Sequence, residues 1–328
     1  MQSVGYLPLF LYLCRSFSEI MDYLFLVIAL TLIVVGAMLL TDGSVALARR
    51  MRIPEFIVGL TVVAVGTSMP EMAVSMISAI EGHGDMAIGN VVGSNIANTL
   101  LILGVCAIFS PILFTKSNVR RDVPLNLVVS VLLLIVAFTS TAINRIEGII
   151  LLVAYIAMIL YSIRSDRKAM AADEGAVAEE MSAWRILVWI VAGLAGLIYG
   201  GDLFVGSATN IAKAWGVSEA VIAISLVAVG TSLPELAASL ASIFKGSPSI
   251  ALGNIIGSNI ANILLILGAC STVTPLAMSG VSMTDMYMVV ATAVMLLLSA
   301  LLIGDKRITR IEGLIFLIVY VVYIYTLI

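Results

Sequence analysis

The chain has 328 residues, of which 61% are hydrophobic and 11% are charged, and its formal net charge is −3. So few charged side chains could not cover the apolar surface of a soluble domain, so the composition excludes a soluble globular protein. The sequence predicts an all-α integral membrane protein.

Apolar runs of about 20 residues, the length that crosses a hydrocarbon core, recur along the chain. They predict ten transmembrane helices, at residues 22–42, 54–80, 86–109, 122–142, 145–163, 184–206, 218–244, 249–273, 284–303 and 309–327. Residues 1–21 form an N-terminal extension, in which Met21 is a candidate start of translation because an apolar run follows it directly. The polar residues 164–183 are expected to form a solvated linker.

The two halves of the chain repeat one another. Residues 61–111 and 225–275 are identical at 28 of 51 positions, and the match extends to a first repeat of five spans (22–163) and a second of five spans (184–328). Because five is odd, the second repeat must begin from the opposite face of the membrane. The sequence therefore predicts two inverted five-helix repeats, a common basis of alternating access in secondary transporters.

The basic residues predict the orientation of the helices. If the N-terminus lies outside, 14 of the 17 Lys and Arg residues fall in cytoplasmic connections or at their helix ends. This bias follows the positive-inside rule. We expect a multi-pass protein of the cell (inner) membrane with both termini outside and the 164–183 linker inside.

The first repeated motif, G-T-S-x-P-E, covers residues 66–71 and 230–235. Its glycine and proline predict a broken helix at membrane depth, where carbonyl groups freed by the break need partners. Thr, Ser and Glu then supply hard oxygen donors that suit calcium or sodium. A Gly-Pro kink alone is usually a packing hinge, but a repeated intramembrane glutamate is not a packing residue. The candidate ligands are the side chains of Thr67, Ser68, Glu71, Thr231, Ser232 and Glu235 and the carbonyls of Ala64 and Ala228.

The second repeated motif, G-N-x-x-G-S-N-I-A-N, covers residues 89–98 and 253–262. Its small residues recur every four positions and predict close helix contacts. Its polar residues form a neighbouring stripe that could bind ions or supply hydrogen bonds between helices. We take Ser94, Asn98, Ser258 and Asn262 as candidate ligands or gate residues, and both roles stay open for Asn90, Asn254, Asn95 and Asn259.

The remaining reactive residues point to no second site. Asp202 has Met38 as its repeat mate, so it lies outside the symmetric site, and Cys106 and Cys270 are expected to be small buried residues. No Cys/His metal cluster or cofactor motif is present. His83 is expected in a loop, and solvated or capping roles near helix ends are expected for Asp42, Glu55, Glu147, Glu219 and Glu312.

The two motifs, once in each half, resemble the α-repeats of the calcium/cation antiporter superfamily, and most of all its prokaryotic sodium/calcium exchangers. The resemblance covers nearly the whole chain from about residue 22. It implies ten helices, central glutamates at Glu71 and Glu235, and the hydroxyl, carbonyl and amide ligands named above. Several relatives, including potassium-dependent exchangers, carry Asp where this chain has Asn262, which favours a plain sodium/calcium exchanger.

We therefore expect a secondary active antiporter, not an enzyme, that exchanges sodium for calcium by alternating access. The resemblance implies electrogenic calcium export with more than two sodium ions per calcium. The alternatives are a proton/calcium or potassium-dependent antiporter that uses the same glutamates. A channel is disfavoured by the inverted repeats, and an intramembrane hydrolase by the lack of a His or Lys at membrane depth to activate Ser68 or Ser232. Partners are the transported ions and the lipid bilayer; no nucleic acid or obligate protein partner is expected.

Overall fold

The fold is almost entirely helical, as the composition predicts. The structure is a computed structural model that describes residues 6–170, 181–217, 228–278, 281–301 and 306–327. Segments labelled η are π-helical turns, which continue directly into neighbouring α-helices. In chain order the elements are α1 (Tyr6–Met51), α2 (Glu55–Val58), η1 (Gly59–Val63), α3 (Ala64–Thr67), α4 (Met69–Ile80), α5 (Gly84–Ile96), η2 (Ala97–Ile102), α6 (Leu103–Phe109), β1 (Ile112–Leu113), η3 (Asn118–Asp122), α7 (Val123–Thr139), β2 (Ala142–Ile143), α8 (Arg145–Met170), α9 (Ala183–Ala214), α11 (Ala228–Thr231), α12 (Leu233–Phe244), α13 (Pro248–Ala261), η5 (Asn262–Ile266), α14 (Leu267–Val273), β3 (Leu276–Ala277), α15 (Met283–Leu301), β4 (Arg307–Ile308) and α16 (Arg310–Leu327).

The helices agree with a membrane-spanning chain. Within the described residues, eight helices are long and apolar enough to cross a membrane, or nine if the bent pair Glu55–Thr67 and Met69–Ile80 counts as one span. The shorter apolar helix Leu233–Phe244 belongs to the predicted span 218–244, whose first ten residues, Glu219 among them, lie outside the described residues. α1 begins inside the predicted N-terminal extension, and α8 continues seven residues into the predicted linker.

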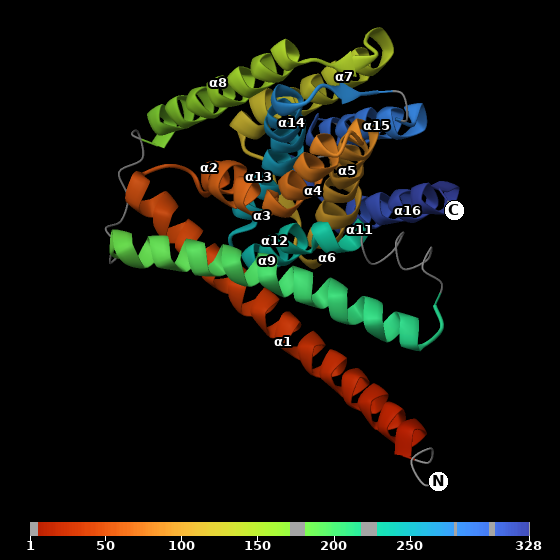
Figure 1. The fold of residues 1–328 in the computed structure, drawn as a ribbon. Helices are drawn as coiled ribbons and strands as arrows, with labels where there is room; N and C mark the ends of the chain where they lie inside the picture. Colours follow the sequence, from red (N-terminus) through yellow and green to blue (C-terminus); the bar gives the residue numbers. More distant parts are fainter. Residues whose placement is uncertain (1–5, 171–180, 218–227, 279–280, 302–305, 328) are drawn as a thin grey trace.

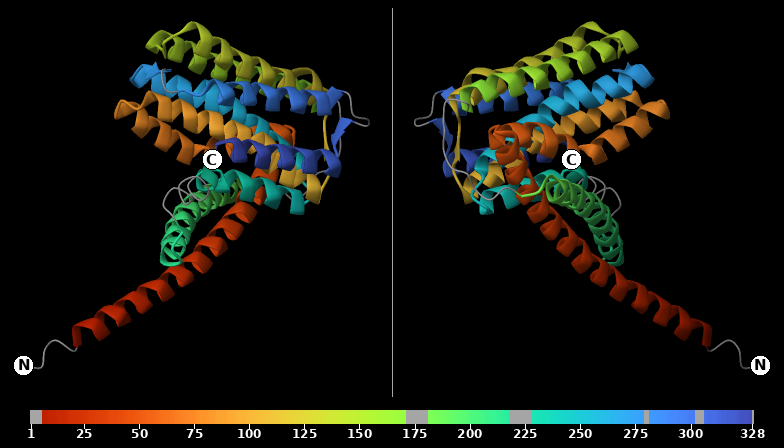
Figure 2. Two further views of the ribbon diagram at one scale, coloured as in Figure 1. Left: turned by 90° about the vertical axis from the view of Figure 1, so that its right-hand side faces the viewer. Right: turned by 90° about the vertical axis from the view of Figure 1, so that its left-hand side faces the viewer.

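α1 and α9 form a crossed pair that lies beneath the remaining helices in Figures 1 and 2. Glycines make their close approach possible. A Cβ atom on Gly36 would lie 2.8 Å from the carbonyl oxygen of Gly193, and one on Gly193 would lie 2.6 Å from the backbone nitrogen of Leu40. Because the two backbones touch, α1 and α9 are packed as one unit.

α13 lies at the centre of the bundle and is buried along almost its whole length. It packs against α2, η1 and α3. Its glycines allow this contact, since a Cβ on Gly257 would lie 2.7 Å from the Cβ of Ala64. The small-residue stripe predicted for close helix contact therefore has that role in the second repeat.

Two short antiparallel strand pairs join the halves of the chain. β1 pairs with β4, with Ile112 opposite Ile308, and β2 pairs with β3, with Ala142 opposite Ala277. The repeat relates β1 to β3 and β2 to β4, so each half contributes one strand to each pair. These strands are too short to be predicted from hydrophobic periodicity.

Candidate cation-binding site

Both broken helices are interrupted at the serine of the first motif. Ser68 has φ −82° and ψ 11°, and Ser232 has nearly the same conformation, φ −87° and ψ 1°. At the first break the helix bends by 47°. Proline follows two residues later, where the first turn of a helix tolerates a missing N–H. The break that the motif predicts is thus found, and it places Glu71 and Glu235 in the first turns of α4 and α12.

Hydrogen bonds connect the first break to the second repeat. The hydroxyl of Ser68 donates to Glu235 Oε1 at 2.9 Å and lies 3.1 Å from the hydroxyl of Ser258. The Ser258 hydroxyl is also 3.5 Å from the carbonyl oxygen of Ala64, which accepts the backbone N–H of Ser68. Four predicted ligands from both repeats are therefore in contact, and the Ala64 carbonyl keeps a helical partner.

The two glutamates are the charged groups of this cluster. Each side chain is only 1% exposed, and the two carboxylates are close enough to interact electrostatically. The helices around them cross between repeats: α4 packs against η5, and α12 packs against η2. Asn262 begins η5 and Asn98 lies in η2, so each amide sits on the element that contacts the other repeat's glutamate helix.

The cluster contains buried oxygen atoms that lack hydrogen-bond partners. In the described part of the chain these include Glu71 Oε2, Glu235 Oε2, Ser232 Oγ, Asn98 Oδ1 and Asn262 Oδ1. An unsatisfied buried polar group costs about 1–3 kcal/mol, and each of these atoms can accept or coordinate. Five such oxygens within one predicted ligand set favour a bound cation.

The other predicted ligands differ in their exposure. Thr67 is fully buried and its hydroxyl donates to Asn254 Oδ1 at 3.2 Å. Ser94 is buried on α5, whereas Thr231, at the end of α11, is half-buried. Ala228 begins α11, and its side chain lies outside the part of the chain whose exposure is described.

Asn90 and Asn254 hold the helix that follows each break. Asn90 Nδ2 donates to the carbonyl of Glu71 at 3.2 Å and to Ser75 Oγ at 2.9 Å. Asn254 makes the same pair of bonds to Glu235 and Ser239, at 3.3 and 3.0 Å. These amides therefore supply hydrogen bonds between helices, which is one of the two roles that the sequence left open for them. The serine partners escaped the sequence analysis, although each lies four residues after its glutamate in both repeats.

A second group of buried amides joins α5 to α13. Asn262 Nδ2 donates to Asn95 Oδ1 at 3.0 Å, and Asn95 Nδ2 donates to the carbonyl of Asn259 at 3.1 Å. Asn259 Nδ2 in turn donates to the hydroxyl of Thr99 at 2.8 Å. All four side chains are at most 2% exposed. Asn95 and Asn259 thus also serve as links between helices.

The glycines of the second motif differ in burial between the two repeats. Gly253 and Gly257 on α13 are buried, whereas their repeat mates Gly89 and Gly93 on α5 are exposed. Polar side chains connect α1 to the C-terminal end of α12. Lys245 forms an ion pair with Asp42, and the hydroxyls of Thr41 and Ser242 are 3.3 Å apart.

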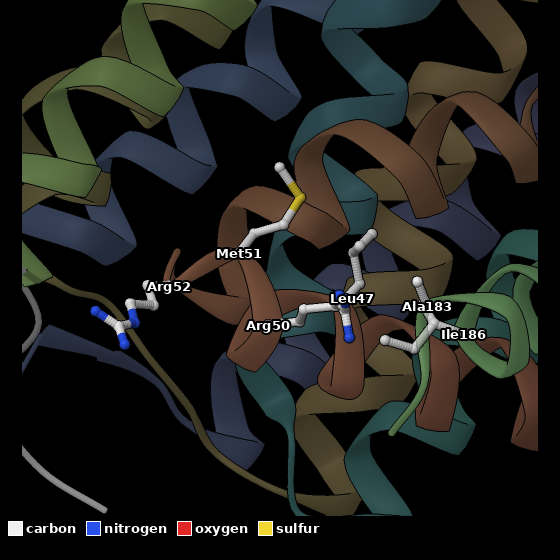
Figure 3. A pocket seen from close by; sticks show the side chains of 6 residues that line it. All are labelled: Leu47, Arg50, Met51, Arg52, Ala183 and Ile186. Atoms are coloured by element: carbon white, nitrogen blue, oxygen red, sulfur yellow. The ribbon is translucent and has the colours of Figure 1, made fainter. Parts of the chain in front are cut away.

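The cavity shown in Figure 3 is separate from this cluster. It has a volume of about 500 Å³, lies where the end of α1 meets the start of α9, and contains two arginines. Arginines repel cations, so this hollow does not suit a cation. Its lining consists of Leu47, Arg50, Met51, Arg52, Ala183 and Ile186.

The capping, loop and burial roles expected for several individual residues are confirmed. Glu147 and Glu312 accept backbone N–H groups at the starts of α8 and α16, which are capping roles. His83 is an exposed residue immediately before α5, and Cys106 and Cys270 are buried and free. Within the described residues, no three His, Cys, Asp or Glu side chains lie close enough together to hold a metal ion. The cluster therefore consists of two carboxylates with hydroxyl and amide oxygens.

A membrane-spanning bundle that buries two carboxylates among hydroxyl and amide oxygens has the features of a cation transporter. The sequence profile of the family described as "Sodium/calcium exchanger protein" matches residues 21–164 and again residues 185–328. The chain belongs to this family of transmembrane cation antiporters.

Individual relatives match most of the chain or nearly all of it. The sodium/calcium exchanger MaX1 of Methanosarcina acetivorans is 31% identical over 93% of this chain and 98% of its own. The inner membrane protein YrbG of Escherichia coli is 35% identical over 76% of this chain and 79% of its own. A structure of the sodium-calcium exchanger NCX_Mj, soaked without sodium or calcium, superimposes with a TM-score of 0.82 at 32% identity. The superposition covers 94% of this chain and 99% of the exchanger chain.

Proposed function

We propose that this protein exchanges sodium for calcium across the membrane by alternating access. The observation that carries the proposal is the set of buried oxygens around Glu71 and Glu235 that have no hydrogen-bond partner among the described residues. Hard oxygen donors with two negative charges suit one Ca²⁺ or two Na⁺. The ligands we assign are Glu71, Glu235, Thr67, Thr231, Ser68, Ser232, Ser94, Ser258, Asn98 and Asn262, with the carbonyls of Ala64 and Ala228.

Competition for one pair of carboxylates explains exchange. Calcium neutralises both charges, and so do two sodium ions, so the cluster cannot hold both loads without excess positive charge in a poorly hydrated place. Sodium that enters down its gradient then displaces calcium toward the outside. More than two sodium ions per calcium, as the resemblance implies, make this export electrogenic. Amides at Asn98 and Asn262 instead of carboxylates keep the site at two charges, which disfavours potassium as an additional cargo.

An imposed sodium gradient should drive ⁴⁵Ca²⁺ uptake into vesicles that contain the purified protein. The flux should vanish when choline replaces sodium, and it should increase with a membrane potential that favours net charge movement. A pH gradient at constant sodium is the matched control. Calcium flux that follows the pH gradient and ignores sodium would instead select proton/calcium exchange, and flux that needs potassium would select the potassium-dependent type.

The strand pairs support ten spans in two inverted repeats. Paired strands must lie at the same face of the membrane, so an even number of crossings separates β1 from β4. Five described helices that are long enough to span lie between them. The sixth crossing is then the segment 218–244, which contains α11 and α12. Each repeat thus has five spans, and with basic residues inside, both termini face outward from the inner membrane.

Labelling of single cysteines tests this topology in a variant that lacks Cys14, Cys106 and Cys270. Trp215→Cys and Ala277→Cys, both exposed, should react with an impermeant maleimide from outside, because two crossings separate them. Leu113→Cys on β1 should react only in permeabilised cells. Labelling of Trp215→Cys and Ala277→Cys from opposite faces would mean that 218–244 does not cross.

In this topology the glycine stripes of the two repeats lie in opposite halves of the membrane. The exposed glycines Gly89 and Gly93 lie in the outer half of α5, and the covered glycines Gly253 and Gly257 lie in the inner half of α13. Alternating access would require the α1–α9 pair to slide relative to the helices that carry the candidate ligands. The ion pair between Asp42 and Lys245 would open during this movement.

A further inference from the structure

Thr99 and Ile263 break the symmetry of the amide group that joins α5 to α13. They occupy equivalent repeat positions, but only threonine can accept a hydrogen bond. Asn259 donates to Thr99, whereas its mate Asn95 has an isoleucine at the corresponding place and donates to the carbonyl of Asn259. The Asn95 amide is thereby fixed with its oxygen toward Asn262.

This arrangement determines which end of the Asn262 amide is available to an ion. The nitrogen of Asn262 donates to Asn95 Oδ1 at 3.0 Å, so its own Oδ1 must point away from Asn95. That oxygen is buried and has no partner among the described residues. A cation is repelled by an amide NH₂ and attracted by an amide oxygen, so the orientation of this side chain matters for affinity.

We infer that Asn95 is a positioning residue that holds the amide oxygen of Asn262 toward the cation. The inference rests on the proposed binding of a cation by Glu71, Glu235 and Asn262. Asn95 itself touches no ion. It also suits an asparagine at position 262, because an amide whose orientation is fixed presents its oxygen, and not its NH₂ group, to the cation.

The test is a double-mutant cycle measured as equilibrium ⁴⁵Ca²⁺ binding to the purified full-length protein. Asn95→Leu keeps the branched shape of the side chain but removes the acceptor, and it should raise the Kd for Ca²⁺ about fivefold, the loss expected for one neutral hydrogen bond. A carboxylate presents oxygens on both branches and needs no fixed orientation. In an Asn262→Asp background the same Asn95→Leu change should therefore leave the Kd unchanged within about twofold.

Asn259→Ala is the matched control. It removes a buried amide from the same group without touching the nitrogen of Asn262, so its effect should be equal in both backgrounds. If Asn95→Leu does not fold, Asn95→Ala takes its place in the cycle. An equal rise in Kd in both backgrounds, or no rise in the native background, overturns the inference.

The measurement also separates the two proposals. Because binding is measured without a gradient, the result does not depend on which ion drives transport. A native protein that binds no Ca²⁺ would contradict the proposed function itself. Calcium binding without the expected dependence on the residue at 262 would contradict only the role of Asn95.

Discussion

Glu235→Gln should abolish sodium-driven calcium flux while the protein stays folded. Glutamine keeps the shape of the side chain and an oxygen that can accept from Ser68, which donates to Glu235 Oε1. It removes one of two negative charges in a cluster where the carboxylate is 1% exposed. A unit charge pair at 4 Å is worth about 4 kcal/mol at an effective dielectric constant near 20, so we expect a loss of at least a hundredfold. Glu71→Gln should have the same effect.

Glu312→Gln is the matched control for this loss. Glu312 is also buried, at 5% exposed, and also has an oxygen with no partner in the described chain. Its other oxygen caps the start of α16 through Thr309. Its replacement should lower stability by about 1 kcal/mol and leave the flux near native. Reconstituted ⁴⁵Ca²⁺ flux and thermal unfolding measure both effects. Flux retained in Glu235→Gln would show that the charge pair is not the transport site.

Valine at equivalent positions of the two repeats should produce different defects, a loss of stability at Gly257 and a loss of transport at Gly93. At Gly257 a Cβ would lie 2.7 Å from the Cβ of Ala64, so Gly257→Val should lower the thermal stability or the folded yield, since overpacking costs roughly 1–3 kcal/mol or more. At Gly93 the described residues place no atom within 4 Å of a Cβ. Gly93→Val should therefore disturb the described packing less than Gly257→Val does.

Gly93→Val should nevertheless fail to transport. If the repeats exchange roles during transport, we expect α5 to be covered in the alternate state as closely as α13 is covered here, and valine would prevent that contact. We expect near-native calcium binding and unfolding temperature with flux reduced at least tenfold, a barrier increase of about 1.4 kcal/mol. Native flux in this variant would contradict the expectation that neighbouring helices pack against α5 in the alternate state.

The sequence predicts the helices and the break of this site because both follow from local chemistry. Apolar length defines the spans, and the Gly-Thr-Ser-x-Pro-Glu motif predicts the break that the structure has at Ser68 and Ser232. The close α1–α9 contact is only hinted at by the paired glycines Gly36 and Gly200. Their role depends on the backbone of the other helix, which no local pattern reveals.

The roles of the asparagines could not be separated from the sequence. Asn90, Asn95 and Asn98 share one repeated motif, yet the first two bond to neighbouring helices and the third has a buried oxygen without a partner in the described residues. Which amide bonds to a helix depends on the partner opposite it, such as Ser75 or Thr99. The difference between Thr99 and Ile263 is visible in the sequence, but its effect appears only when α5 and α13 are seen side by side.

The two reciprocal strand pairs have a consequence for biosynthesis. β1 lies in the first half of the chain, but its partner β4 directly precedes the last helix. β2 also lies in the first half, and its partner β3 lies in the second half. A ribosome that inserts helices in order therefore leaves both early strands without partners until late in translation. The first repeat cannot complete its connections by itself, so the final structure depends on assembly of the two halves together.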